Sequence, residues 1–207
     1  MKGLLLKDIL NLKKQSRIML LMTAFYFMLG LMYENPSFLT GMIVLLFTML
    51  SITSFSYDDL AKWDRYALSL PVTRSELVLG KYVLAAVLAG AGTVLSFAGA
   101  MFFSFIKSPI DITEQLAVSY ALFAVAMLFV SVLFPIIFKF GVEKGRMLMI
   151  AVFAVPMGAI YALSYLGISL PSEEQLTTLL IFSPVIIFVF TAVSYALSKS
   201  VYNKKEF

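Results

Sequence analysis

The stretch Asp58–Lys81, DDLAKWDRYALSLPVTRSELVLGK, decides how this chain is organised, because it gathers charge between two long apolar runs. These 24 residues hold eight of the chain's 28 charged residues (16 basic and 12 acidic) and its only tryptophan. Segments long enough to cross a bilayer flank the stretch on both sides. The pattern predicts a structured, charged connection at a membrane surface.

The composition of the whole chain supports a membrane protein. Hydrophobic residues make up 61% and charged residues 14%, against about 25% charged residues in soluble domains. The mean hydropathy is +0.94. We therefore predict an all-α polytopic membrane protein with a single transmembrane domain over residues 1–207. The formal charge of +4 is explained by lysine and arginine residues beside the spans, and no nucleic-acid partner is expected.

Residue types that carry chemistry are scarce. The chain has no cysteine and no histidine, which removes thiolate metal sites, the commonest metal ligand and the commonest acid-base catalyst. Metalloprotease, serine-hydrolase and nucleotide phosphate-binding motifs are also missing from the sequence. We expect no catalytic residue, no metal site and no cofactor in this chain, and therefore no enzyme activity of its own.

Six apolar stretches approach or exceed the roughly 20 residues that a membrane span requires. Three proline-containing turns separate some of them, at 34–36, 107–109 and 170–172. The predicted spans cover residues 18–33, 38–57, 79–106, 116–138, 147–170 and 176–197.

The basic residues predict the orientation of these spans. With the N-terminus inside the cell, 15 of the 16 lysine and arginine residues fall in cytoplasmic segments and only Lys107 falls outside. We therefore predict that both termini are cytoplasmic, and that the protein is a multi-pass protein of the plasma membrane. In the first 17 residues, Leu5, Ile9 and Leu12 share one helical face, and the lysines lie elsewhere on the helix. This segment is either an interfacial amphipathic helix or a basic topology anchor that happens to be helical.

The connection over residues 58–78 contains two helix-start signals. Ser56 with Asp59, and Thr73 with Glu76, both match the capping-box pattern. The first predicts that a new helix starts near Ser56, and the second predicts the start of the third span. Between them, apolar residues recur at helical spacing, and Pro71 ends the run. We expect a short amphipathic cytoplasmic helix whose apolar positions are Leu60, Trp63, Ala67 and Leu70. Taken singly, Trp63 also suits a membrane-interface anchor, and the charges suit a solvated face.

Two features of the spans bear on function. Gly92, Ser96 and Ala100 form a stripe of small residues, which predicts a helix-packing seam within one chain or between two. No charged residue falls deep in a predicted span, whereas ion-coupled carriers generally place ionisable groups near the bilayer midplane. An ion-driven carrier is therefore disfavoured, although helices broken at proline remain an alternative ion site.

The order of residues in the central connection resembles the first cytoplasmic loop of the ABC transporter type-2 (ABC-2) permeases, most closely the small permeases of Gram-positive bacteria. The resemblance is carried by Asp58-Asp59, then Trp63-Asp64-Arg65-Tyr66, then residues 67–74, and finally Gly80-Lys81-Tyr82. The six-span layout extends it along the chain. Larger lipid and drug exporters have a structured region between their fifth and sixth spans, where this chain has only residues 171–175. Their substrate gate is therefore not carried over.

The resemblance implies a membrane subunit that pairs with a second permease subunit, identical or related, and sits on separate ATP-binding subunits. ATP and magnesium would bind in those partners. The helix between the second and third spans corresponds to the coupling helix, and the N-terminal segment to an interfacial helix in contact with membrane lipid. The residues implied to couple to the ATPase are Asp58, Asp59, Trp63, Asp64, Arg65 and Arg74.

The function predicted from the sequence is the permease subunit of an ATP-driven exporter of a hydrophobic or amphipathic substrate, such as an antimicrobial peptide, a drug or a lipid. Two alternatives stay open: an ATP-independent carrier or channel, and a membrane scaffold whose charged connection recruits a cytoplasmic protein.

Overall fold

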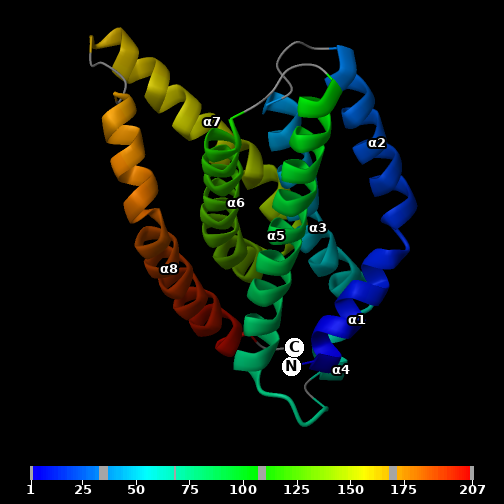
Figure 1. Cartoon of the computed structure of the whole chain (residues 1–207). Helices are drawn as coiled ribbons and strands as arrows, with labels where there is room; N and C mark the ends of the chain where they lie inside the picture. The colour runs from blue at the N-terminus through cyan, green and yellow to red at the C-terminus, as the bar shows by residue number, and fades with distance from the viewer. Residues whose placement is uncertain (1, 33–36, 68, 107–110, 168–171, 206–207) are drawn as a thin grey trace. The chain divides into compact units, whose positions relative to one another are not determined.

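The computed structural model describes residues 2–32, 37–67, 69–106, 111–167 and 172–205. Every regular element in these ranges is a helix (Figure 1). In chain order the helices are α1 (Lys2–Lys13), α2 (Ser16–Met32), α3 (Ser37–Leu60), α4 (Trp63–Ala67), α5 (Arg74–Ile106), α6 (Ile112–Phe140), α7 (Val142–Tyr165) and α8 (Glu173–Asn203).

The helices confirm the coarse prediction of an all-helical polytopic membrane protein. Among the described residues, α3, α5, α6, α7 and α8 are each long and apolar enough to span a membrane. The axes of α1 and α2 meet at 66°, and this bent pair makes a sixth candidate span if it is counted as one. The turns predicted at 34–36 and 107–109 lie outside the described residues, as do 170 and 171 of the third turn. The inward orientation of both termini stays a prediction.

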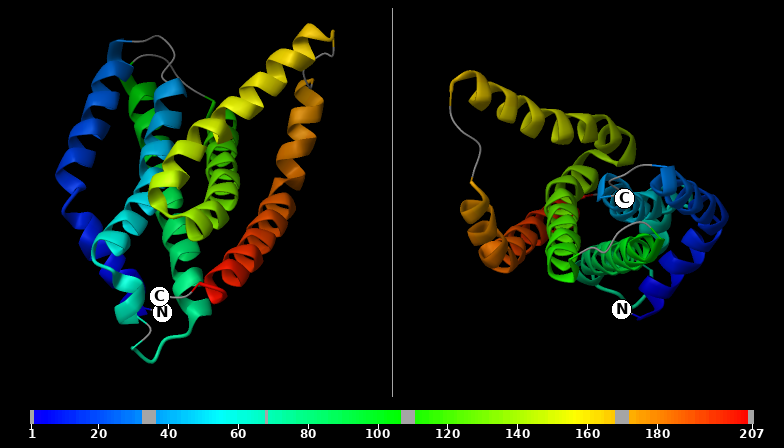
Figure 2. Two further views of the ribbon diagram at one scale, coloured as in Figure 1. Left: turned by 180° about the vertical axis from the view of Figure 1, so that it is seen from behind. Right: turned by 45° about the horizontal axis from the view of Figure 1, so that its top comes forward.

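The chain divides into two compact units within α6, one up to Met127 and one from Leu128 to Lys205. In the first unit α3 and α5 lie side by side, with α1 and α2 beside them (Figure 2). Leu12, Met19, Leu50 and Leu84 form a buried cluster to which α1, α2, α3 and α5 each contribute one residue. The short helix α1 is therefore part of the packed core of this unit.

Gly92, the first residue of the predicted small-residue stripe on α5, lies against α3 of the same chain. Gly92 faces α3 so closely that a Cβ atom added there would lie 2.8 Å from Cβ of Phe47 and 3.2 Å from Cα of Val44. Ser96 and Ala100 are also buried. The small side chains allow the two backbones to approach in an environment where lipid supplies little drive for helix association.

Helices α2 and α5 are joined by aromatic rings that lie on glycines. The Phe27 ring of α2 covers Gly99 of α5, and the Phe103 ring of α5 covers Gly30 of α2. The two ring centroids are 5.8 Å apart. This reciprocal arrangement holds α2 against α5.

In the second unit, the C-terminal half of α6 packs against α8 through hydroxyl groups and aromatic rings. The Ser194 hydroxyl donates to the backbone carbonyl of Ser131 at 2.5 Å, and the Ser131 and Thr191 hydroxyls are 3.2 Å apart. Phe138 and Tyr202 make an edge-to-face pair. Elsewhere α7 and α8 expose most of their apolar residues, which leaves broad surfaces for lipid or for another subunit.

Candidate functional site

The connection between α3 and α5 differs from the sequence prediction at its start. A new helix was expected near Ser56, but α3 continues unbroken to Leu60, so that prediction is wrong. The predicted amphipathic helix is shorter than expected, because α4 covers only Trp63–Ala67 and Leu60 is 82% exposed at the end of α3. Lys62, which joins the two helices, has a φ of 48°. This left-handed backbone turns the chain sharply between α3 and α4.

The second predicted helix start is confirmed. The Thr73 hydroxyl accepts a hydrogen bond from the Glu76 backbone N–H at 3.2 Å, and the Glu76 carboxylate accepts from the Thr73 backbone N–H at 2.9 Å. This is the reciprocal pair of a capping box. It fixes the point at which the chain leaves the connection and enters α5.

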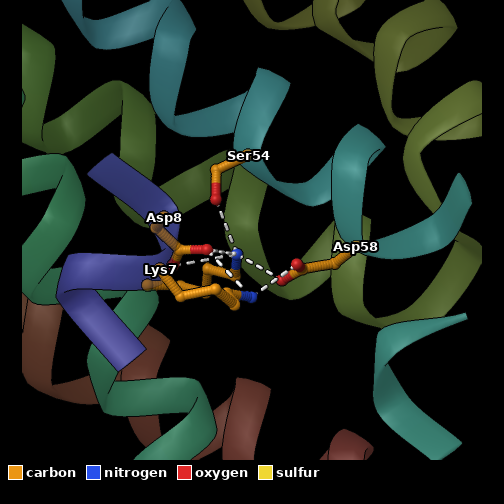
Figure 3. Close-up of polar contacts among 5 residues, drawn as sticks. Lys7, Asp8, Ser54 and Asp58 are labelled. Atoms are coloured by element: carbon orange, nitrogen blue, oxygen red, sulfur yellow. Dashed lines mark hydrogen bonds and ion pairs between the residues drawn. The ribbon is translucent and has the colours of Figure 1, made fainter. Parts of the chain in front are cut away.

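Four charged side chains meet where α1, α3 and α5 converge, and we call them the charge ring: Lys7, Asp8, Asp58 and Lys81 (Figure 3). The Lys7 ammonium lies 3.0 Å from the Asp8 carboxylate and 2.5 Å from that of Asp58. The Lys81 ammonium lies 3.2 Å from Asp8 and 2.5 Å from Asp58. Each cation therefore contacts both anions, and each anion contacts both cations.

The charge ring is buried but electrically balanced. Side-chain exposure is 5% for Asp8, 9% for Lys81, 11% for Asp58 and 21% for Lys7. The Ser54 hydroxyl accepts a further hydrogen bond from Lys81 at 2.7 Å. Removing charges from water costs several kcal/mol per ion, and alternating opposite charges with added hydrogen bonds offset that cost. A variant that leaves one charge unmatched loses the compensation.

The charge ring also explains why α3 continues past Ser56. Carboxylates at the C-terminal end of a helix are unfavourable, because the helix dipole places negative charge there. Asp58 lies in the last turn of α3, where Lys7 and Lys81 neutralise it. The two lysines come from other helices, so their effect on α3 could not be seen in the local pattern.

Trp63 connects α4 to the charge ring. The Lys7 ammonium lies 4.2 Å from the Trp63 ring centroid, within the range of a cation–π contact. Trp63 also packs against Tyr66, with ring centroids 5.4 Å apart, and Ala67 is fully buried. Helix α4 is therefore held against the rest of the first unit by its own side chains, and α1 provides one of the contacts.

The structure places most of the predicted coupling residues around α4. One small pocket of about 180 Å³ is lined by side chains from the end of α3 and the start of α4, namely Asp58, Asp59, Lys62, Asp64 and Arg65. Asp59 and Arg65 are exposed, whereas Trp63 and Asp64 are half-buried. Arg74 lies at the first position of α5. Asp58 is the one predicted coupling residue that is also a member of the charge ring, where its carboxylate contacts Lys7 and Lys81.

Sequence reasoning missed the other members of this arrangement: Lys7, Asp8, Ser54 and Lys81. A signal for Asp8 was available, since Asp8 shares a helical face with Leu5 and Leu12. The buried face of α1 therefore includes an acid, and Ile9, which we expected on that face, is 48% exposed. A lone acid on the packed face of a basic segment indicates a buried cationic partner.

Among the residues that the structure describes, no three acidic, histidine or cysteine side chains are grouped so that they could hold a metal ion. The charge ring is occupied by its own lysines. Its arrangement can fix helices relative to one another.

The comparisons with known proteins agree with this architecture. The sequence model of the ABC-2 family transporter proteins matches residues 3–203. The chain therefore belongs to the ABC-2 transporter family, whose members are membrane components of transporters and generally work with an ATP-binding subunit. A search of curated proteins and a search of solved structures returned no match. The resemblance stated from the sequence is confirmed at the level of the family.

Proposed function

We propose that this chain is the permease subunit of an ATP-driven exporter in the plasma membrane. It pairs with a separate ATP-binding subunit and with a second permease subunit, identical or related, and moves a hydrophobic or amphipathic substrate out of the cell. ATP and magnesium bind in the partner, and this chain contributes no catalytic residue. The observation that carries the proposal is the family match over residues 3–203.

The geometry around α4 supports a contact with the ATP-binding subunit. Helix α4 lies at the end of the first unit where α1 packs and α5 begins (Figure 1). The connection presents both charge signs, with Asp59 and Arg65 exposed and Asp64 half-buried. Complementary charges steer and orient a protein partner. We place Asp59, Trp63, Asp64, Arg65 and Arg74 in or beside this contact.

Asp58 takes a different part in the same site. Its carboxylate oxygens contact Lys7 and Lys81, each at 2.5 Å. It therefore contributes to the ATPase contact by holding the end of α3, on which α4 is carried, and the exposed groups make the contact itself.

Exposed apolar surfaces support pairing within the membrane. The most apolar windows of α7 and α8 are 6% and 0% buried within the chain. Surfaces of this kind face lipid or another helix bundle. They give a second permease subunit, either a copy of this chain or a relative, an area on which to pack.

Polar side chains within the spans are hydrogen-bonded to the protein itself, which favours a hydrophobic or amphipathic substrate. The Thr48 and Ser51 hydroxyls of α3 bond to backbone carbonyls of their own helix. The Ser194 hydroxyl of α8 bonds to the backbone of α6. Groups satisfied in this way offer little to a strongly charged solute, which needs charged or polar partners in a membrane.

The test is a paired substitution in α4 with a matched control. The chain is expressed with a tag, the ATP-binding subunit that co-purifies with it is identified, and ATP hydrolysis is measured in lipid nanodiscs. Asp59→Ala with Arg65→Ala removes one charge of each sign from the connection. Glu143→Ala with Lys144→Ala makes the same change at two exposed positions of α7, at the other predicted cytoplasmic connection.

We expect the α4 variant to insert normally and to lose most of the permease-dependent ATP hydrolysis, and we expect the α7 variant to keep it. Equal hydrolysis by both variants would refute the contact at α4. Substrate transport driven by an ion gradient, in vesicles that hold only this polypeptide, would refute the ATP-driven function as a whole.

A further inference from the structure

The charge ring bridges every pair of the three helices that meet in it. Lys7 of α1 contacts Asp58 of α3, Lys81 of α5 contacts Asp58, and Lys81 also contacts Asp8 of α1 (Figure 3). The sequence separation is 51 residues for the first of these contacts and 73 for the last. One closed set of ion pairs therefore fixes three helices against one another at the end of the unit that carries α4.

Lys7 extends this connection to α4. Its ammonium contacts two carboxylates of the charge ring and also lies over the Trp63 ring, at 4.2 Å from the centroid. Helix α4 has a second, covalent connection to the ring, because α3 continues to within three residues of Trp63. A displacement of α4 therefore acts on the ring both through α3 and through Lys7.

Burial makes the ring resistant to partial opening. Drawing α3 or α5 away from the other two helices would leave a net unmatched charge in a region where the carboxylates and Lys81 are at most 11% exposed. Unpaired buried charge is strongly unfavourable. This cost holds α3 to α5, and α1 is joined to both by one ion pair each, Lys7–Asp58 and Asp8–Lys81, so the ring can act as a mechanical connection.

We propose that the charge ring is a positioning element, in which Lys7, Asp8, Asp58 and Lys81 make α1, α3 and α5 move as one body with α4. The proposal rests on the proposed function in one respect: the displacement of α4 is supplied by the ATP-binding partner. Lys7 is the central residue, because it contacts both the ring and Trp63.

A decoupling variant follows from the geometry. The double substitution Lys7→Leu with Asp8→Leu, which we call the decoupling variant, removes both charged residues that α1 contributes to the ring. It leaves Lys81 paired with Asp58 at 2.5 Å. The ring loses one charge of each sign, so no net charge is left buried. The conservative variant Lys7→Arg keeps the cation, and Glu143→Gln with Lys144→Met removes an exposed charge pair from α7 as the matched control.

The first measurement uses this chain alone in nanodiscs. Since the sequence has no cysteine, paired spin labels can be placed at single engineered cysteines. Lys13 of α1 and Leu79 of α5 are both exposed, and a second pair joins Arg65 of α4 to Leu79. We expect narrow distance distributions for the otherwise unchanged chain, the Lys7→Arg variant and the α7 control, and broad or shifted ones for the decoupling variant.

Distributions that stay narrow and unshifted in the decoupling variant would overturn the proposal. If the leucine pair does not fold, Lys7→Gln with Asp8→Asn removes the same charges while keeping hydrogen-bonding groups, and the same comparison applies. This measurement needs no partner, so its result is independent of whether the proposed function is correct.

The second measurement adds the co-purified ATP-binding subunit. We expect the decoupling variant to bind it with unchanged affinity, while permease-dependent ATP hydrolysis falls by on the order of tenfold, a usual size for coupling between two sites. Loss of binding together with hydrolysis would overturn the positioning role, since the ring would then only support the docking surface. If the unsubstituted chain does not stimulate ATP hydrolysis by the co-purified subunit at all, the proposed function is refuted. The result of the first measurement is not affected by that outcome.

Discussion

Replacement of Gly92 by alanine tests the close approach of α3 and α5. The added Cβ would lie 2.8 Å from Cβ of Phe47 and 3.2 Å from Cα of Val44. Neither of these atoms can be moved by rotating a side chain, because Cα of Val44 belongs to the backbone of α3 and Cβ of Phe47 is bonded directly to it. The two helices must therefore separate, and the buried contacts between them must loosen. Gly90, two residues away on α5, has no atom within 4 Å of an added Cβ and supplies the matched control.

The expected size of the effect follows from two opposing contributions. A glycine to alanine change inside a helix gains about 1 kcal/mol of helix propensity. Adding a methyl group to a packed interface costs about 1–3 kcal/mol. The propensity gain applies to both variants and cancels in the comparison. Gly92→Ala should therefore be less stable than Gly90→Ala by about 1–3 kcal/mol.

Thermal unfolding in lipid nanodiscs, followed by the fluorescence of the single tryptophan, measures this difference. For a chain of this size, each kcal/mol shifts the Tm by about 2–4 °C. Gly99→Ala should fall between the other two variants, because its clash is with the outer end of the Phe27 ring, which can rotate. Equal Tm values for Gly92→Ala and Gly90→Ala would refute the packing described for α3 and α5.

Three further predictions concern the charge ring and the connection. Lys81→Met should lower the free energy of unfolding by about 3–5 kcal/mol, because two buried carboxylates are then left with one lysine; retention of the parent Tm would contradict a buried ring. Thr73→Ala should lower the free energy of unfolding by about 1 kcal/mol, because it removes the N-cap of α5. Thr73→Ser keeps the hydroxyl and should unfold at the parent Tm in the same assay. Lys62→Ile should lower the free energy of unfolding by about 1–2 kcal/mol, because a β-branched residue is unfavourable in the left-handed backbone at a φ of 48°. Lys62→Asn should leave the free energy of unfolding almost unchanged. Identical Tm values for the two variants would argue against this turn.

The two capping-box patterns show how far local sequence information extends. The Thr73–Glu76 pattern predicted the start of α5 correctly, because the hydrogen bonds that define it join residues three positions apart. The pattern at Ser56–Asp59 is equally good in sequence and was wrong, because α3 continues through it. Whether that pattern starts a helix depended on Lys7 and Lys81, which lie 51 and 23 positions from Asp58 along the chain.

The predicted coupling residues also differ in how much of their setting is visible in the local sequence. Asp59 and Arg65, predicted as coupling residues from the resemblance of the central connection, are exposed, and their coupling role stays a prediction. Asp58 was grouped with them by its neighbours in sequence, but the structure turns its carboxylate toward the ring. The helical face that Asp8 shares with Leu5 and Leu12 is visible in the sequence, but its partner Lys81 is 73 residues away and could not be identified from the local pattern.

An all-helical membrane protein with a charged connection between two spans could be predicted from the sequence alone, because hydrophobic length and charge distribution are properties of short segments. The ABC-2 family was predicted from a resemblance in the residue order of that connection, and the family match confirms it. Which charged side chains are buried against one another could be learned only from the tertiary structure. The reason is physical: burying an ion requires an opposite charge from elsewhere in the chain, and the convergence of α1, α3 and α5 brings those charges together.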